Sequence, residues 1–228
     1  MRQIKGSRSP SSEARMLTYK VGNMNKLLLI VLIFSSMVAH AQTAPVLRVG
    51  DVLLQPLKCW ACSLIEAEEE TIYSHIGVVL AVSPEVVVGE AFGKVRKLSL
   101  AAFNAKTEPG QKLMVIRFRN DDLSTDIQQA ADAFMKNFDE DFLGAQYDHD
   151  FRWNNFDESG TEKFYCSELV SKLFQGFVGI ETHVKRMHFQ TNRDQWMTFF
   201  KGNIPDNEWG NSPGDFERSD LFYQVGEL

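Results

Sequence analysis

Cys166 is the residue of this sequence whose type and setting most directly suggest chemistry. It lies in the stretch Phe164-Tyr165-Cys166-Ser167-Glu168-Leu169-Val170. Apolar residues recur at positions 166, 169, 170, 173, 174 and 177, the period of about 3.6 residues that marks one helix face. Cys166 is therefore expected early in an amphipathic helix, on its inward face. Backbone N–H groups and the positive end of the helix dipole there would favour a thiolate, the nucleophilic form of cysteine.

Cys166 also has an interpretation without chemistry, because most unpaired cysteines are small buried apolar residues. The polar run at residues 157–161 supplies candidate caps for the helix N-terminus. A nucleophilic thiol also needs a base nearby. The position of Cys166 alone does not separate the two interpretations.

A histidine and a glutamate inside an apolar hairpin are the candidates for that base and its partner. Residues 73–82 and 86–92 are predicted to form two buried strands joined by a turn at Pro84. Paired residue numbers then sum to about 166–168, which places Glu90 within two or three positions of His75. The register is uncertain by one residue, and such a shift would turn Glu90 to the other face. The alternative is a hydrogen-bonded core histidine and a glutamate exposed at the sheet edge.

The remaining elements must position these side chains. Residues 46–55 predict a turn into a short strand, residues 63–70 a short acidic helix, and residues 112–119 a strand. Residues 95–103 fit either a strand or a short helix. One helix is expected to begin near residues 122–124 and to end at Gly144, with its inward face formed by Ile127, Ala131, Phe134, Phe138 and Phe142. The tail from Asn203 to Leu228 is predicted to be loop-like except at residues 216–222.

Cys59 and Cys62 form a C-x-x-C pair, which fits a local disulfide, a redox pair or half of a zinc site. The sequence has no second C-x-x-C and no H-x-x-x-H to complete a zinc site. A thiol pair without chemistry of its own is favoured, and neither a metal nor a cofactor is predicted. Asp148, His149 and Asp150 alternate in direction on a strand or loop, so they are expected to be solvated. His183 and His188 are expected at the surface.

The N-terminal segment has the pattern of a secretory signal. A basic stretch precedes the apolar run at residues 27–34, and Ala39-His40-Ala41 fits a cleavage site. The apolar run is shorter than the roughly 20 residues of a membrane-spanning helix. We therefore expect residues 1–41 to be an N-terminal extension and signal peptide, and residues 42–228 to be one exported domain, periplasmic or secreted, without a stable membrane anchor.

The expected mature chain is strongly acidic. The whole sequence has a formal net charge of −6, and residues 1–41 hold six Lys or Arg and one Glu, so the mature chain carries −11. Nucleic acids and anionic lipid surfaces bind proteins through Lys and Arg. The charge therefore argues against a nucleic-acid partner and against work at an anionic membrane.

An ordered set of motifs resembles a known family. The set is Arg48-x-Gly50-Asp51 followed by hydrophobic residues and Gln55, Ser74-His75-Ile76-Gly77-Val78-Val79, Gly89-Glu90-Ala91, Gly144-x-x-Tyr147-Asp148-x-x-Phe151, Tyr165-Cys166-Ser167-Glu168-Leu169-Val170 and Ser212-Pro213-Gly214-Asp215-Phe216. In this order the motifs resemble the YiiX-like permuted papain-fold amidases. That group is related to the NlpC-type cell-wall peptidases and to lecithin:retinol acyltransferase. The resemblance extends over most of residues 46–222.

The resemblance implies a circularly permuted papain-like α+β fold, in which an antiparallel sheet packs against helices that include the nucleophile helix. It implies Cys166 as the nucleophile, His75 as the base and Glu90 as the polar third member. An imidazole beside a thiol converts it to a thiolate, and a carboxylate on the other ring nitrogen fixes the tautomer. Tyr147 and Tyr165, which belong to two of the motifs, are expected to contact the substrate.

Four functions compete at this stage. The first is an exported cysteine hydrolase that cleaves an amide, with a small or peptide substrate derived from the cell wall as the candidate. The second is a lipid-directed acyltransferase, esterase or thioesterase, which an apolar cleft would favour. The third is a non-catalytic binding module, and the fourth is a thiol oxidoreductase that uses Cys59 and Cys62. The fourth lacks a thioredoxin-like βαβ unit around its cysteines. Oligomeric state is not encoded in any pattern of the sequence.

Overall fold

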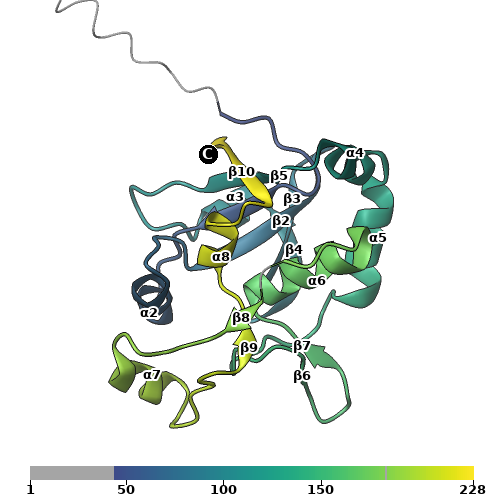
Figure 1. The fold of residues 1–228 in the computed structure, drawn as a ribbon. Helices are drawn as coiled ribbons and strands as arrows, with labels where there is room; N and C mark the ends of the chain where they lie inside the picture. Colours follow the sequence, from purple (N-terminus) through teal and green to yellow (C-terminus); the bar gives the residue numbers. More distant parts are fainter. Residues whose placement is uncertain (1–43, 183) are drawn as a thin grey trace, which may run out of the picture. The chain divides into compact units, whose positions relative to one another are not determined.

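The predicted hairpin forms two adjacent inner strands of a six-stranded antiparallel sheet. Its strands, β2 (His75–Ala81) and β3 (Val87–Phe92), pair Val78 with Gly89 and Val79 with Val88, in the predicted register. The other strands of this sheet are β1 (Val52–Gln55), β4 (Lys94–Ser99), β5 (Met114–Phe118) and β10 (Phe222–Glu227). The strand order is β10-β5-β1-β2-β3-β4. The computed structural model describes residues 44–182 and 184–228 (Figure 1).

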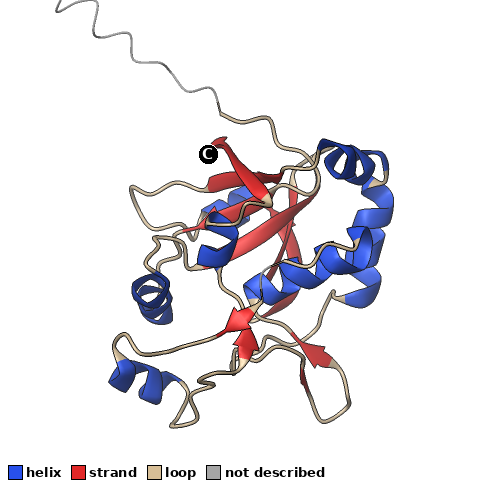
Figure 2. Cartoon of the chain, viewed as in Figure 1, coloured by secondary structure: helices blue, strands red, loops and turns tan. Residues whose placement is uncertain are grey.

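Both faces of the sheet are buried, because alternate side chains of each central strand enter different apolar clusters. On one face, Ile76, Val78 and Leu80 join the main core, which the helices α5 (Ala131–Asp141) and α6 (Cys166–Val178) cover. On the other face, Val79 and Val88 pack with Phe103 of the short helix α3 (Leu100–Asn104). Figure 2 shows α5 and α6 running beside the strands. The fold is the expected α+β arrangement of an antiparallel sheet and helices.

Residues 95–103 contain both of the structures that the sequence allowed. The strand β4 ends at Ser99, whose side chain accepts a hydrogen bond from the backbone N–H of Ala102 and caps α3. A serine at this position can end a strand and begin a helix without an intervening loop. The ambiguity of the segment therefore reflects two short elements in sequence.

The single helix expected to end at Gly144 is two helices, α4 (Asp121–Gln129) and α5. Ala130 separates them with non-helical backbone angles, φ −106° and ψ 27°. The break has a packing reason, because α4 contacts β5 whereas α5 contacts β2 and α6. The chain bends so that each helix faces its own part of the sheet. The predicted inward residues Ile127, Phe134, Phe138 and Phe142 are buried, and the fifth, Ala131, is half-buried and packs against the same core.

The C-terminal tail is more regular than its composition indicated. It contains β9 (Trp209–Gly210), α8 (Pro213–Glu217) and β10. β10 pairs with β5 at one edge of the sheet, with a register shift between Gln224 and Gly226. Ser212 caps α8 in a reciprocal capping box with Asp215. The prediction of a loop-like tail was wrong here.

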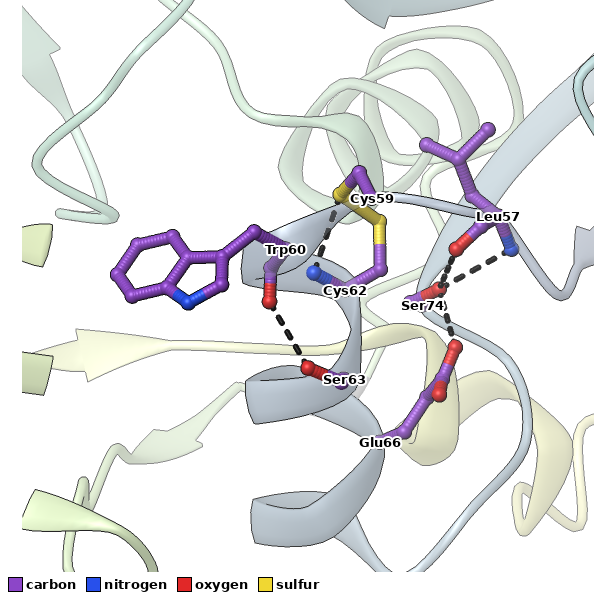
Figure 3. The surroundings of a disulfide bond; sticks show 7 residues. All are labelled: Leu57, Cys59, Trp60, Cys62, Ser63, Glu66 and Ser74. Atoms are coloured by element: carbon purple, nitrogen blue, oxygen red, sulfur yellow. Dashed lines mark hydrogen bonds between the residues drawn. A yellow bond between two sulfur atoms is a disulfide. The ribbon is translucent and has the colours of Figure 1, made fainter. Parts of the chain in front are cut away.

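Cys59 and Cys62 form a disulfide at the start of helix α2 (Trp60–Glu69), as Figure 3 shows. Cys59 is the N-cap, and its sulfur accepts a hydrogen bond from the backbone N–H of Cys62. Further along α2, Glu66 accepts a hydrogen bond of 2.8 Å from the hydroxyl of Ser74, the residue before β2. Of the three readings of C-x-x-C, the structure has the local disulfide. It closes the first turn of a helix that Glu66 links to Ser74, the residue before β2.

The remaining short elements are β6 (Asn155–Phe156), β7 (Glu162–Lys163), β8 (Lys185–Arg186) and α7 (Arg193–Phe199). Residues 44–228 form one compact unit. Within the described ranges, no helix has the length and apolar character needed to cross a bilayer. The predicted signal at residues 1–41 and the predicted surface position of His183 lie outside the described residues. His188 is exposed, as expected.

Candidate active site

His75 and Glu90 meet on one face of the central hairpin. Glu90 Oε2 lies 2.6 Å from His75 Nε2, and both side chains are nearly inaccessible to solvent, with 1% and 3% of their side-chain surface exposed respectively. The alternative of an edge-exposed glutamate is therefore wrong. Phe92 and Phe103 hold the imidazole, each with its ring centroid 5.7 Å from that of His75. The ring is fixed by packing as well as by the carboxylate.

Glu90 is also held by two cations that the sequence did not single out. Arg96, directly opposite Glu90 in the β3–β4 ladder, donates from both Nε and Nη2 to Glu90 Oε1, with the Nε contact at 2.8 Å. Lys106 Nζ lies 3.8 Å from the same oxygen. Burial raises the pKa of Glu90, but the hydrogen bonds and charges of His75 and Arg96 outweigh it, so the pKa is lowered. Glu90 is thus a carboxylate that carries its charge next to the imidazole.

Cys166 is the thiol that faces His75. The sequence contains three cysteines, and the disulfide of Cys59 with Cys62 leaves Cys166 free. Burial lowers the pKa of His75, but hydrogen bonds to Cys166 and Glu90 and the charges of both groups outweigh that effect and raise the pKa to about 9. Since Nε2 is engaged by Glu90, Nδ1 is the ring nitrogen left for the thiol. The three side chains of the sequence prediction are therefore brought together in the order thiol, imidazole, carboxylate.

Cys166 is the first residue of α6, and Tyr165 is its N-cap. Among the described contacts, the side chain of Tyr165 makes no capping hydrogen bond. The series of helical hydrogen bonds in α6 starts at Leu169, whose backbone N–H donates to the carbonyl of Tyr165. The N–H of Cys166 thus lies at the positive helix end, where it can stabilise an oxyanion formed next to the sulfur.

The candidate caps at residues 157–161 do not cap α6. Asp157 accepts hydrogen bonds from the backbone N–H groups of Ser159 and Thr161 and closes the turn between β6 and β7. Two strand residues, Glu162 and Lys163, then separate this turn from the helix. The polar run is a hairpin turn because its own aspartate satisfies its backbone.

A cleft opens beside Cys166. It is lined mainly by apolar and aromatic side chains, together with several polar ones that border it. Its lining includes Ile65, Tyr147, Phe151, Tyr165, Met187, Phe189, Trp196 and Pro213, with Glu68, Glu69, Ser74, Ser167, Asn211 and Ser212. Tyr147 and Tyr165 therefore border the cleft, as their predicted role requires. Burial raises the pKa of both phenols, so both are neutral hydroxyls at physiological pH.

Asn211 was missed by sequence analysis. Its backbone N–H donates to the hydroxyl of Tyr165 at 3.0 Å, and its carbonyl accepts from the hydroxyl of Ser167 at 3.1 Å. Its side-chain amide donates to the hydroxyl of Ser171. Asn211 thus ties the C-terminal segment to the first two turns of α6. Its 44-residue separation from Ser167 leaves no periodic signal in the sequence.

Asp148 is buried, which corrects the expectation that residues 148–150 are all solvated. It has 0% exposure, and it accepts hydrogen bonds from the backbone N–H groups of Asp150 and Arg152 and from Asn155. A short acidic side chain that caps its own loop explains the burial. His149 and Asp150 are exposed, as predicted. Among residues 44–182 and 184–228, no group of three or more His, Cys, Asp or Glu side chains is arranged to hold a metal ion.

The fold and this site define a papain-like cysteine hydrolase in which the histidine and the carboxylate precede the nucleophile in the chain. Comparison with known families agrees. The profile of the permuted papain-like amidase enzymes of the YaeF/YiiX type, family C92, matches residues 46–225. The chain belongs to this family. It is therefore an enzyme of the cysteine amidase or peptidase type, which argues against the non-catalytic binding module.

Two similar proteins come from Escherichia coli. The uncharacterized protein YiiX of strain K12 is 29% identical over 150 residues, which cover 66% of this chain and 68% of that protein. The crystal structure of the metalloprotein yiiX from strain O157:H7 superposes with a TM-score of 0.65 at 23% identity. That alignment covers 79% of this chain and 97% of the other. The structural likeness supports the fold.

Proposed function

We propose that this enzyme is an exported cysteine hydrolase that cleaves an amide through an acyl-enzyme on Cys166. The proposal is supported by the position of His75, which is hydrogen-bonded to Glu90 and whose pKa is raised in part by the nearby thiol of Cys166. A thiol, an imidazole and an orienting carboxylate are the parts that nucleophilic catalysis by cysteine requires. Neither Cys59 nor Cys62 is needed, because the disulfide occupies both sulfurs.

In the proposed reaction, His75 takes the proton of Cys166, and the thiolate attacks the carbonyl carbon of the amide. The oxyanion that forms is stabilised by the N–H of Cys166 at the start of α6. His75 then returns the proton to the amine as the C–N bond breaks, which leaves a thioester on Cys166. Water, deprotonated by His75, attacks the thioester and releases the acid. Glu90 stabilises the imidazolium in both half-reactions.

Export is supported by two independent features. The first is the signal pattern at residues 27–41, with cleavage expected after Ala41. The second is the disulfide of Cys59 and Cys62, because disulfides persist in oxidising compartments such as the periplasm. N-terminal sequencing of protein from the periplasm or the medium tests this, and a mature chain that begins at Gln42 is expected.

The substrate is proposed to be a small amide or peptide, with cell-wall fragments as the first class to test. Purified peptidoglycan fragments and phospholipids are incubated with the wild type, with Cys166→Ala and with the exposed-site control Ser63→Ala, and the products are identified by mass spectrometry. Hydrolysis by the wild type and the control but not by Cys166→Ala is expected. Turnover that survives Cys166→Ala would refute the mechanism. So would labelling of Cys166 by iodoacetamide no faster than that of a free cysteine peptide.

A second candidate, hydrolysis or transfer of a lipid acyl group, is favoured by one observation. The side chains around Cys166 are mainly apolar and aromatic. An apolar cleft prefers an apolar acyl group over a charged peptide, because apolar burial is the main source of binding free energy there.

A further inference from the structure

The charged side chains that line the cleft are already paired. Glu69 contacts Lys185 at 2.7 Å and Arg218 at 3.1 Å. Glu68 accepts hydrogen bonds from the backbone N–H groups of Gln190 and Thr191. The rest of the described lining carries no Lys, Arg or Asp. Little charge is therefore free to recognise a charged group on a substrate.

The cleft wall away from Cys166 is a small apolar core of its own. This cluster contains Leu64, Met187, Phe189, Trp196 and Phe200, with Ile65, Phe151, Phe199 and Ile204 packed against it. It lies between α2 and α7, separate from the two clusters on the sheet. Because several of its members also line the cleft, a ligand at Cys166 touches an aromatic surface that continues outward.

A row of aromatic rings leads from the nucleophile to the molecular surface. Ring centroids are separated by 5.6 Å between Tyr165 and Phe151, by 5.4 Å between Phe151 and Phe199, and by 6.2 Å between Phe199 and Trp60. Exposure increases along this aromatic row, from buried Tyr165 through half-buried Phe151 and Phe199 to Trp60, which is 54% exposed.

The backbone conformation of Phe151 also points to a functional role for this residue. Its φ is 51°, in the left-handed region that bulky residues rarely adopt. Such strained residues concentrate at functional sites. The strained backbone holds the Phe151 ring between Tyr165 and Phe199, in the middle of the aromatic row.

We propose that the cleft and the aromatic row bind a long, uncharged alkyl chain on the substrate carbonyl, with the chain leaving the thiol along Phe151 and Phe199 and ending at Trp60. The space beside Cys166 measures about 40 Å³ for the centres of water-sized molecules, and one water needs ~10–15 Å³ on that measure, so it has room for the reacting group and only the first carbons of a chain. The chain therefore lies along the row. This inference rests on the proposed acyl-enzyme chemistry of Cys166 and develops its second candidate substrate, the lipid acyl group, by naming where the chain binds.

The expected gain per carbon follows from apolar burial. Each methylene removed from water contributes ~0.8 kcal/mol of binding free energy. This corresponds to about a fourfold increase in the second-order rate constant for labelling at low reagent concentration. The rate constant should stop increasing once the alkyl chain is long enough to extend past Trp60. A polar chain of equal length should show no such increase, because it gains nothing from leaving water.

The test measures alkylation of Cys166, the free thiol of the chain, by N-alkyl iodoacetamides of increasing length. The sulfur displaces iodide, and intact-mass spectrometry gives the second-order rate constant for each chain. A matched series with oligo(ethylene glycol) chains controls for length alone. We expect the alkyl series to rise about fourfold per methylene and the glycol series to stay flat. Equal rate constants along the alkyl series, or equal rises in both series, would overturn the proposal.

Variants locate the binding surface. Phe199→Ala and Trp60→Ala should lower the ratio of the long-chain to the short-chain rate constant, whereas Phe156→Ala should leave that ratio unchanged. Phe156 is a matched control because it is an aromatic residue, 55% exposed, outside the aromatic row. Trp60→Ala keeps the test decisive if Phe199→Ala does not fold. An unchanged ratio in folded Trp60→Ala and Phe199→Ala would refute the row as the path of the chain.

Labelling separates this inference from the proposed hydrolysis. A protein that shows the chain-length effect without Cys166-dependent turnover of any amide or ester would contradict the proposed function and retain the binding site. A protein that hydrolyses amides through Cys166 but labels independently of chain length would retain the function and contradict the inference.

Discussion

Glu90 Oε2 lies 2.6 Å from Nε2 of His75, although the two residues are 15 positions apart in the chain. The hairpin register brings them together, and the burial of both side chains makes the contact electrostatically strong. One carboxylate oxygen faces the imidazole while the other binds Arg96. Glu90 is therefore held from two sides, and the imidazole orientation depends on it.

Replacing Glu90 with Gln should lower kcat/KM by roughly 10²–10⁴-fold, the range that proton-transfer catalysis supplies. The amide keeps the shape but loses the charge that stabilises the imidazolium of His75. Steady-state kinetics on the best amide substrate measures the effect. Glu85→Gln, an exposed residue of the turn after β2, serves as the matched control. A loss smaller than threefold in folded Glu90→Gln would show that the carboxylate has no role in catalysis.

Arg96 should act as a positioning residue. Arg96→Met removes the two donors that fix Glu90 Oε1, and we expect kcat/KM to fall ~10-fold with KM little changed, because small misplacements of a catalytic group are costly. A positive charge near His75 disfavours the imidazolium. Removal of the Arg96 cation should therefore raise the pKa of His75 and move the basic limb of the pH profile to higher pH. Lys97→Met, which loses only a surface pair with Asp139, should change neither quantity. An unchanged pH profile in Arg96→Met would leave a structural role only.

The pH dependence should distinguish the two tasks of His75. Its pKa of about 9 means that the imidazolium predominates at neutral pH and is lost as pH rises through that value. Cleavage of an amide needs this proton for the leaving amine, so kcat/KM should fall above about pH 9. Alkylation of Cys166 by iodoacetamide needs the thiolate and no proton donor, so its rate should not fall there. Parallel decline of both profiles would contradict the assignment of His75 as the acid.

The sequence predicts those strands and helices in which the buried apolar residues recur at a regular spacing. β2, β3 and β5 follow the apolar patterns of strands and lie within the predicted ranges, and α6 covers the predicted apolar positions from Cys166 to Phe177. β10 escaped prediction because it is an edge strand whose alternation is interrupted by the register shift at Gly226. The division of α4 from α5 depends on which strands they contact, information that is absent from the local sequence.

The residues of the site also divide into those that the sequence could predict and those that it could not. Cys166, His75 and Glu90 stand out because a thiol, an imidazole and a carboxylate occupy otherwise apolar segments. Arg96 had a usable signal, since Gly93 marks a turn that would pair residue 96 with Glu90 once β4 is taken as a strand. Asn211 and the aromatic row had none, because their contacts join segments far apart in sequence.

Asp148 should matter for stability more than its acidic neighbour does. Asp148→Asn removes an acceptor oxygen from a buried carboxylate that binds the N–H groups of Asp150 and Arg152, and we expect it to lower the free energy of unfolding by ~1–3 kcal/mol. Asp150→Asn changes a side chain that is 57% exposed, so a change within ~0.5 kcal/mol is expected. Urea unfolding of both variants in the Cys166→Ala background, which avoids thiol exchange, measures the difference. Because the Asp148 loop carries Tyr147 and Phe151 to the cleft, Asp148→Asn in the protein that retains Cys166 should also reduce the chain-length effect on Cys166 labelling. Equal unfolding midpoints at equal m-values for the two variants would show that the buried contacts of Asp148 contribute nothing to the fold.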